Sequence, residues 1–400
     1  MASILGLLIV AILVAIIARR LRLPYIVGLV VAGVCLAFSP IHLGVSLTRN
    51  VIFEIILPPL LFEAALNIHW KDLRQDALPI LSLAIPGTVI AAAIITLAAH
   101  YGLNWPLTSS VLFGTLIAAT DPVAVIATFR DNHVQGRLRL LVESESLLND
   151  GVAAVLFALA LTWAEAAGQT QPQITDIAAL LVTTIGGGIL IGAACTALAI
   201  LLMGRTEDYL VENTVTTVLA YTSFLLADHF HCSGVLAAVT AGLLMGNISL
   251  ISKGRLSLAL TEKGREFSHA LWDYIAFIAN SFVFLLIGIT VAGIPVNAFT
   301  GKGLALTIFV LFVSRALTVY PISALFSRSR WKISFKFQHI LFWGGLRGAL
   351  GMALALSLPQ DLPLRSEVIV ATFAVVIFSV VVQGLTMPVL LNLLGITRRR

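Results

Sequence analysis

The chain has 400 residues, of which 59% are apolar and 11% charged, and its formal net charge is +5. Soluble domains carry roughly 25% charged residues, and a mean hydropathy of +1.00 over the whole length is more than a globular interior can hide from water. The composition therefore excludes a soluble enzyme, a disordered protein and a secreted disulfide scaffold, and it predicts an all-α polytopic membrane protein.

Apolar runs interrupted by charged residues, Pro and Gly predict about thirteen transmembrane helices, because a helix needs about 20 apolar residues to cross a bilayer. The predicted spans lie at 3–18, 24–38, 51–68, 78–99, 108–128, 138–162, 175–203, 212–228, 233–250, 267–292, 303–326, 337–357 and 366–394. No cleavage-site pattern accompanies the first run, so it is interpreted as a retained helix rather than a signal peptide.

The basic residues are distributed unequally between the two sides that these spans define. Of the 25 lysines and arginines, twenty fall on one side, three on the other (Arg49, Lys302 and Arg365) and two inside spans (Arg315 and Arg347). Because the positive side of a membrane protein faces the cytoplasm, the N-terminus is predicted outside and the C-terminus in the cytoplasm, in the plasma or inner membrane. Short basic loops between apolar runs do not indicate a nucleic-acid partner.

Six ionisable side chains lie at membrane depth, where each costs roughly 2.5–3.5 kcal/mol on insertion scales and so needs a partner or a function. They are Glu63, Asp121, Glu145, Asp150, Arg315 and Arg347. A structural ion pair explains any one of them as well as a function does. Two bases cannot neutralise four acids, however, so one or two carboxylates are predicted to be free to bind a proton or a cation.

The fifth predicted span, 108–128, is interrupted by Thr120-Asp121-Pro122. Proline has no N–H and its ring clashes with the preceding turn, so backbone carbonyls nearby are freed. A simple proline kink would explain Pro122 alone. Freed carbonyls beside the Asp121 carboxylate, in contrast, form a set of oxygen ligands suited to a hard cation, and this interpretation is favoured.

The sixth predicted span, 138–162, carries polar side chains in two rows along one helix. Ser146 and Asp150 are four residues apart and share a face, and so do Glu145 and Asn149. A helix N-cap at the membrane surface would explain the polar residues at the start of the span, but it does not explain Asp150. The stripe therefore predicts a functional surface inside the protein.

The twelfth predicted span, 337–357, contains Gly344, Gly345, Gly348 and Gly351 around Arg347. Glycine weakens a helix interior, so we expect a second discontinuous helix here. Interrupted helices at matching places in two halves indicate an inverted-repeat transporter. Since spans 5 and 12 are seven apart, the expected repeats are spans 1–6 and 8–13, with the seventh span as a linker.

Several stretches, in this order, resemble the monovalent cation–proton antiporter family, in the branch of prokaryotic NhaP and the eukaryotic sodium–proton exchangers. They are 60–66, Thr120-Asp121-Pro122, 145–150, Ser314-Arg315 and 344–348. The resemblance covers essentially the whole chain. It implies a secondary-active Na+/H+ antiporter, not an enzyme and without a cofactor, that has thirteen helices, crosses its two discontinuous helices and forms a homodimer.

The resemblance also implies two subdomains within one transporter unit, 1–400. An ion-binding core, mainly 78–162 and 303–394, would contain spans 4–6 and 11–13, and a dimerisation scaffold would comprise mainly 3–68 and 175–292. The core is expected to move against the scaffold in elevator-type alternating access. The sequence ends at Arg400 soon after the last span, so the long regulatory tail of many eukaryotic members is not expected.

Matched residue by residue, the resemblance makes Asp150 the carboxylate that binds either the cation or the proton. Asp121 would assist it, and Thr120 and Ser146 would complete the oxygen shell, so that Na+ is expected at these four side chains. The supporting residues implied are Asn149, which stands where the electrogenic branch has a second aspartate; Glu145, paired with Arg315; Glu63; and Arg347, near the carbonyl ends of the broken helices.

The expected mechanism is competition between two ions for one carboxylate. Removing a carboxylate from water disfavours its charged form, so Asp150 would be neutralised by either Na+ or H+. One such group exchanges one H+ for one Na+, which predicts electroneutral exchange, and the partners implied are protons, monovalent cations and membrane lipids.

Ligand type alone leaves K+- or Li+-selective antiport open. A cation channel, which usually needs a ring of repeated acids, and an intramembrane aspartyl hydrolase, which needs two carboxylates around one water, fit the pattern less well.

Overall fold

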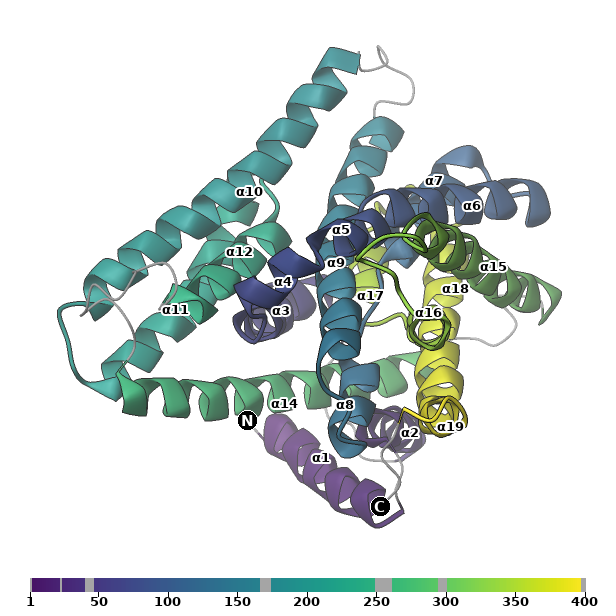
Figure 1. The fold of residues 1–400 in the computed structure, drawn as a ribbon. Coiled ribbons are helices and arrows are strands. Elements are labelled where there is room, and N and C mark those ends of the chain that lie inside the picture. Colours follow the sequence, from purple (N-terminus) through teal and green to yellow (C-terminus); the bar gives the residue numbers. More distant parts are fainter. Residues whose placement is uncertain are drawn as a thin grey trace. The chain divides into compact units, whose positions relative to one another are not determined.

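The structure is a computed structural model that describes residues 2–21, 24–39, 47–165, 174–248, 261–293 and 301–396. The regular elements within these ranges are all helices, as the composition predicts (Figure 1). Contacts divide the chain into two compact units, which are described separately here. The first comprises Met1–Ile52, Asp76–Ala164 and Ser281–Arg400, and the second comprises Phe53–Gln75 and Glu165–Asn280.

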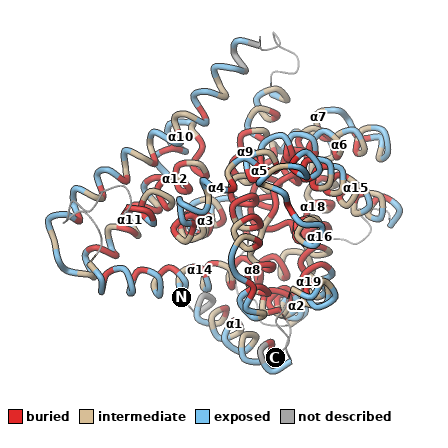
Figure 2. The backbone as a smooth tube through the Cα atoms, viewed as in Figure 1, coloured by how far each residue is buried: buried red, intermediate tan, exposed pale blue. Residues whose placement is uncertain are grey.

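The first unit is built around helices that are interrupted in their middle. Its elements are α1 (Ala2–Leu21), α2 (Tyr25–Ala37), α5 (Ala77–Ala84), α6 (Pro86–Gly102), α7 (Leu107–Ala118), α8 (Val123–Asp131), α9 (Arg137–Glu165), the last part of α14 (Glu262–Ala292), α15 (Gly301–Leu325), α16 (Phe335–Trp343), α17 (Ala349–Leu356), α18 (Arg365–Phe378), the π-helix η3 (Ser379–Gln383) and α19 (Gly384–Leu393). The short helix α17 packs against both α7 and α18. Figure 2 shows buried residues gathered around α9 and α18, so the core of this unit surrounds the interruptions.

The second unit has a conventional apolar core. It contains most of the π-helix η1 (Val51–Ile56), then α3 (Leu57–Leu66), α4 (Trp70–Gln75), α10 (Ile174–Met203), α11 (Tyr209–His229), α12 (Gly234–Gly246) and the first part of α14. Helix α12 packs against α3, α10 and α11. A methyl group on Gly246 would contact the Leu66 carbonyl of α3, so glycine permits this close approach. The rings of Phe62 and Trp272 lie 4.7 Å apart in the same core.

Among the described residues, eight helical segments are long and apolar enough to cross a membrane. They are Ala77–Gly102, Leu107–Asp131, Arg137–Glu165, Ala178–Met203, Tyr209–His229, Glu262–Ala292, Gly301–Leu325 and Arg365–Leu393, and the shorter apolar helices are Leu5–Ala18, Tyr25–Ala37 and Gly234–Gly246. The predicted spans 51–68 and 337–357 contain no uninterrupted helix of that length, because each is divided into shorter elements. The total of thirteen spans stays a prediction.

Both expected discontinuities are confirmed. Helix α7 ends at Ala118 because Ala119 is extended (φ −56°, ψ 139°), and α8 starts after Pro122. Helix α16 ends before Gly344, and α17 starts after the extended Gly348 (φ −146°, ψ −147°). The π-helix η3, which interrupts the predicted span 366–394, was not expected from the sequence.

Candidate functional site

The two helix breaks lie in direct contact. The Asp121 N–H donates to the Leu346 carbonyl (2.8 Å). The buried Arg347 guanidinium donates from Nη1 to the carbonyls of Ala118 and Ala119, both at 2.8 Å. The last carbonyls of a helix have no partner within the helix and carry a partial negative charge. Arg347 therefore compensates the carbonyl end of α7.

The Asp121 carboxylate bridges the starts of the two half-helices that follow the breaks. The Val123 N–H of α8 donates to Oδ1 (2.9 Å), and the Ala349 N–H of α17 donates to Oδ2 (3.4 Å). A helix N-terminus favours a negative charge, so two helix starts stabilise the ionised carboxylate. A methyl group on Gly348 would overlap this carboxylate, so the absence of a Cβ at this position lets α17 approach it.

Thr120, Ser146 and Asn149 form a buried hydrogen-bonded group between the first break and α9. The Ser146 hydroxyl donates to the Thr120 carbonyl, the two hydroxyls are 3.0 Å apart, and Asn149 Nδ2 donates to Thr120 Oγ1 (3.1 Å). Asn149 Oδ1 is buried and has no hydrogen-bond partner among the described residues. An unsatisfied buried acceptor costs about 1–3 kcal/mol, so this oxygen calls for a partner such as a water or a cation.

Asp150 is half-buried on α9, four residues after Ser146 and on the same face. Within the described part of the chain, its carboxylate accepts no hydrogen bond and forms no ion pair. It interacts electrostatically with Asp121, Glu145 and Arg347. Asp150 is thus near the other charges of the site but, unlike Asp121, has no donor to stabilise its negative charge.

Glu145 and Arg315 form the ion pair that the resemblance implied. Arg315 Nη1 and Nη2 donate to the two carboxylate oxygens of Glu145 at 2.8 and 2.9 Å, and Arg315 also donates to the Leu341 carbonyl. Glu145 is 2% exposed and Arg315 9%. The bidentate geometry satisfies both oxygens, so the carboxylate of Glu145 is not left free.

The charges of this site do not cancel. Asp121, Glu145 and Asp150 contribute three negative charges, and Arg315 and Arg347 contribute two positive charges when all are ionised. One negative charge remains, which one proton or one monovalent cation would neutralise. Carboxylate, hydroxyl, amide and carbonyl oxygens are the ligands that hard cations prefer.

Two further expectations fall outside this group. Glu63 belongs to the second unit, where its Oε1 accepts from Asn67 Nδ2 (2.7 Å), and its contribution to the site stays a prediction. Ser379 and Gln383 of η3, in contrast, contact the second break and were not singled out from the sequence. The signal that would have found them is a serine and a glutamine four residues apart in the middle of the apolar span 366–394.

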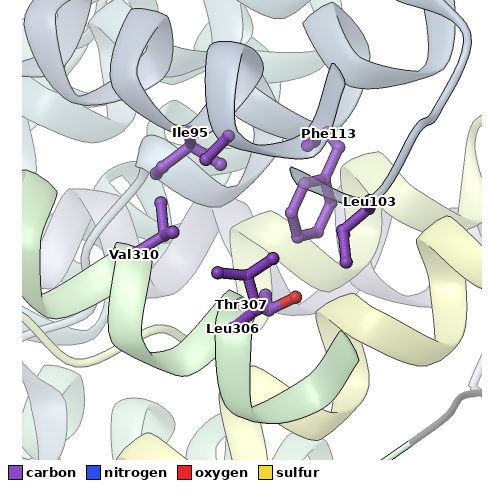
Figure 3. A pocket seen from close by; sticks show the side chains of 8 residues that line it. Ile95, Leu103, Phe113, Leu306, Thr307 and Val310 are labelled. Atoms are coloured by element: carbon purple, nitrogen blue, oxygen red, sulfur yellow. The ribbon is translucent and has the colours of Figure 1, made fainter. Parts of the chain in front are cut away.

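A separate pocket lies between α6, α7 and α15 (Figure 3). It is lined by Ile95, Ala98, Ala99, Leu103, Phe113, Leu306, Thr307 and Val310. The one polar side chain in this lining, Thr307, donates its hydroxyl to the Gly303 carbonyl of its own helix (2.9 Å). The lining therefore lacks the charged groups of the two helix breaks, and the breaks are the candidate functional site.

Known proteins resemble this chain over most of its length. The sequence model of the transmembrane sodium/hydrogen exchanger family matches residues 7–393. The chain is 40% identical over 380 residues to the Na+/H+ antiporter ApNhaP of Aphanothece halophytica, covering 94% of this chain and 70% of that protein. It is 33% identical over 393 residues to the Na+/H+ antiporter NhaG of Bacillus atrophaeus, covering 96% of this chain and 73% of that protein.

The fold has a counterpart among solved structures. The structure of the sodium proton antiporter MjNhaP1 from Methanocaldococcus jannaschii at pH 8 matches with a TM-score of 0.74 and 21% identity, and the match covers 98% of each chain. The chain therefore belongs to the sodium/hydrogen exchanger family, whose members are membrane transporters rather than enzymes.

Proposed function

We propose that the protein is a secondary-active Na+/H+ antiporter in which Asp150 binds either the cation or the proton. The observation that carries this proposal is the state of Asp150, a carboxylate that no described residue stabilises by a hydrogen bond or an ion pair. The named relatives are Na+/H+ antiporters, which supports the same activity here. Thr120, Ser146 and Asp121 supply the other oxygen ligands, and Asn149 Oδ1 is an additional candidate because it is unpaired.

Competition for one carboxylate couples the two ions. The site carries one negative charge in excess when its acids and bases are ionised. An uncompensated charge is costly at membrane depth, so the conformational change is slow unless Na+ or H+ neutralises Asp150. Exchange is then obligatory, because each crossing of the membrane carries one of the two ions.

The stoichiometry proposed is one Na+ for one H+. Glu145 is paired with Arg315, Asp121 accepts hydrogen bonds from two helix starts, and the Asn149 amide does not titrate. Asp150 is therefore the group that changes charge, and the cycle transfers no net charge. The proposal also includes an elevator-type movement of the ion-binding core and assembly as a homodimer. It further places the protein in the plasma or inner membrane with its N-terminus outside.

The test is cation-dependent proton flux in proteoliposomes that contain the purified protein and an internal pH dye. Na+, Li+ and K+ are added in turn against a fixed pH gradient. We expect Na+ to drive proton flux through the wild type and not through Asp150→Asn. The matched control is Asp131→Asn, which makes the same chemical change at an exposed residue of α8.

Each outcome of this test is decisive. Flux that responds to K+ or Li+ but not to Na+ would replace the proposed substrate. Wild-type liposomes without any cation-dependent proton flux would refute the proposal, and a separate bilayer recording that shows single-channel currents would indicate a channel. Equal fluxes through wild type and Asp150→Asn would refute the assignment of the ion-binding carboxylate.

A further inference from the structure

The π-helix η3 contacts both ends of the second helix break. Ser379 Oγ accepts from the Arg347 N–H (3.1 Å) and lies 3.3 Å from the Arg347 carbonyl, and Gln383 Nε2 donates to the Trp343 carbonyl (2.9 Å). Trp343 is the last residue of α16, and Arg347 precedes the residue that caps α17. Two side chains four residues apart on one element thus hold the points where the chain enters and leaves the break.

These contacts are made inside the protein, where they are not replaceable by solvent. Ser379 is fully buried and Gln383 is 2% exposed. The residues of the break, Gly344 to Gly348, include three glycines and make one hydrogen bond among themselves, from the Leu346 N–H to the Gly344 carbonyl. Glycine loses more conformational freedom on ordering than other residues do. Contacts from other elements are therefore needed to hold this segment in one conformation.

Hydrogen bonds connect this second break to the first break, at Thr120 to Pro122. The Leu346 carbonyl accepts from the Asp121 N–H, and the Arg347 guanidinium donates to the end of α7. Thr120, next to Asp121, contacts Ser146 and Asn149 on α9. A continuous series of hydrogen bonds therefore runs from η3 through both breaks to the helix that carries Asp150.

We propose that η3 is a positioning element of the transport site, in which Ser379 and Gln383 hold the second break in the geometry that lets Asp121 and Thr120 reach the cation. The proposal rests on the proposed antiport function. A π-helix is rare and occurs frequently at functional sites. Neither lipid exposure nor apolar core packing explains a serine and a glutamine inside this apolar span. Their contacts with the break do explain them.

Two shape-conserving variants, Ser379→Ala and Gln383→Met, remove the bonds to the break. Thr372→Val is the matched control, because Thr372 is equally buried on α18 but donates only to the Val368 carbonyl of its own helix (2.8 Å). The first measurement is amide hydrogen exchange of peptides that contain Asp121 and residues 344–349. We expect faster amide exchange in both variants and not in Thr372→Val, with all three variants still folded as judged by gel filtration and thermal unfolding.

The second measurement is transport. Losing one net hydrogen bond to the break is expected to raise the KM for Na+ about three- to tenfold at a nearly unchanged maximal rate, and the double variant should exceed either single variant by less than the product of their effects. Ser379→Thr, which keeps the hydroxyl, should restore most of the affinity. A merely structural role would lower the yield or the maximal rate without this selective loss of affinity.

The outcomes separate the two proposals. Unchanged amide exchange at the breaks would overturn the role of η3 whatever the transport result. Faster amide hydrogen exchange with an unchanged KM for Na+ would show that the break moves without consequence for the cation. This result would also overturn the proposed role of η3. A wild type that carries no cation would refute the antiport function, and the exchange measurement alone would then decide whether Ser379 and Gln383 hold the break.

Discussion

Asp121 and Asp150 are two carboxylates of one site with opposite surroundings. Asp121 lies in a helix break, where N–H groups at the starts of α8 and α17 donate to its two oxygens. Asp150 lies within the continuous helix α9, whose own N–H groups are used inside the helix, and it has no donor among the described residues. The interrupted helices thus supply hydrogen-bond donors to one carboxylate, and the continuous helix supplies none to the other.

In the proposed antiport, this difference gives Asp121 a fixed position and makes Asp150 the carboxylate that exchanges ions. A carboxylate that accepts hydrogen bonds from two helix starts links the two half-helices, and the helix ends favour its negative charge. A carboxylate without donors must find its compensation elsewhere, from a proton or a cation. The following predictions test the distinction, beginning with the largest effect.

Asp150→Asn is expected to reduce Na+-dependent proton flux to the background of empty liposomes. The amide keeps the shape of the side chain but cannot change its charge, and Asp131→Asn should behave as the wild type in the same preparation. Folding is checked by gel filtration and thermal unfolding. Substantial flux through Asp150→Asn would mean that Asp121 is the exchanging group, and the distinction drawn above would be reversed.

Glu145→Gln and Arg315→Ala are each expected to lower the free energy of unfolding by about 3–5 kcal/mol, because removing one partner of a buried ion pair leaves the other charge uncompensated. Their effects should not add. The control cycle uses Arg139 and Glu143, a partly exposed pair at 3.2 Å, for which a coupling of about 0.3–0.5 kcal/mol is expected. Additive effects at Glu145 and Arg315 would leave Glu145 as a second candidate for ion exchange.

Asp121→Asn should be milder than Asp150→Asn, since an amide oxygen still accepts one of the two N–H bonds. We expect about 1–2 kcal/mol of destabilisation from the lost helix-end charge and a raised KM for Na+, with measurable exchange. Asp208→Asn is the control, because Asp208 caps α11 through the Leu210 N–H (2.8 Å) and should affect stability alone. Complete loss of exchange in a folded Asp121→Asn protein would contradict the fixed role of Asp121.

The smallest expected effect is electrical. If Asp150 alone changes charge, the cycle transfers no net charge across the membrane. The membrane potential then does no work on the cycle, although it is worth about 2.3 kcal/mol per charge per 100 mV. A solid-supported membrane should then record no steady-state Na+-dependent current, although proton flux is present in the same liposomes. A sustained current, or an exchange equilibrium that shifts with a clamped potential, would show that Asp121 carries a second proton.

The sequence predicted both helix breaks and most of the polar residues of the candidate site. Pro122 and the glycines of 344–348 predicted both interruptions, since the first lacks an N–H and the others lack a Cβ. The polar residues on the stripe of α9 were also found, and the partner of Glu145 came from the resemblance to antiporters. The π-helix η3 was missed because its sequence reads as an ordinary apolar helix apart from Ser379 and Gln383.

The sequence by itself determined the membrane class of the protein, the places where its helices break and the residues that carry charge at membrane depth. These properties are local, because they follow from hydropathy and from the backbone chemistry of single residues. The resemblance supplied the partner of Glu145, and the tertiary structure decided which atoms compensate the other charges. Arg347 reaches carbonyls more than 200 positions away, Ala349 donates to Asp121, and Asp150 is left without a donor. Such partners depend on which helix ends meet in space, and no spacing along the chain specifies that.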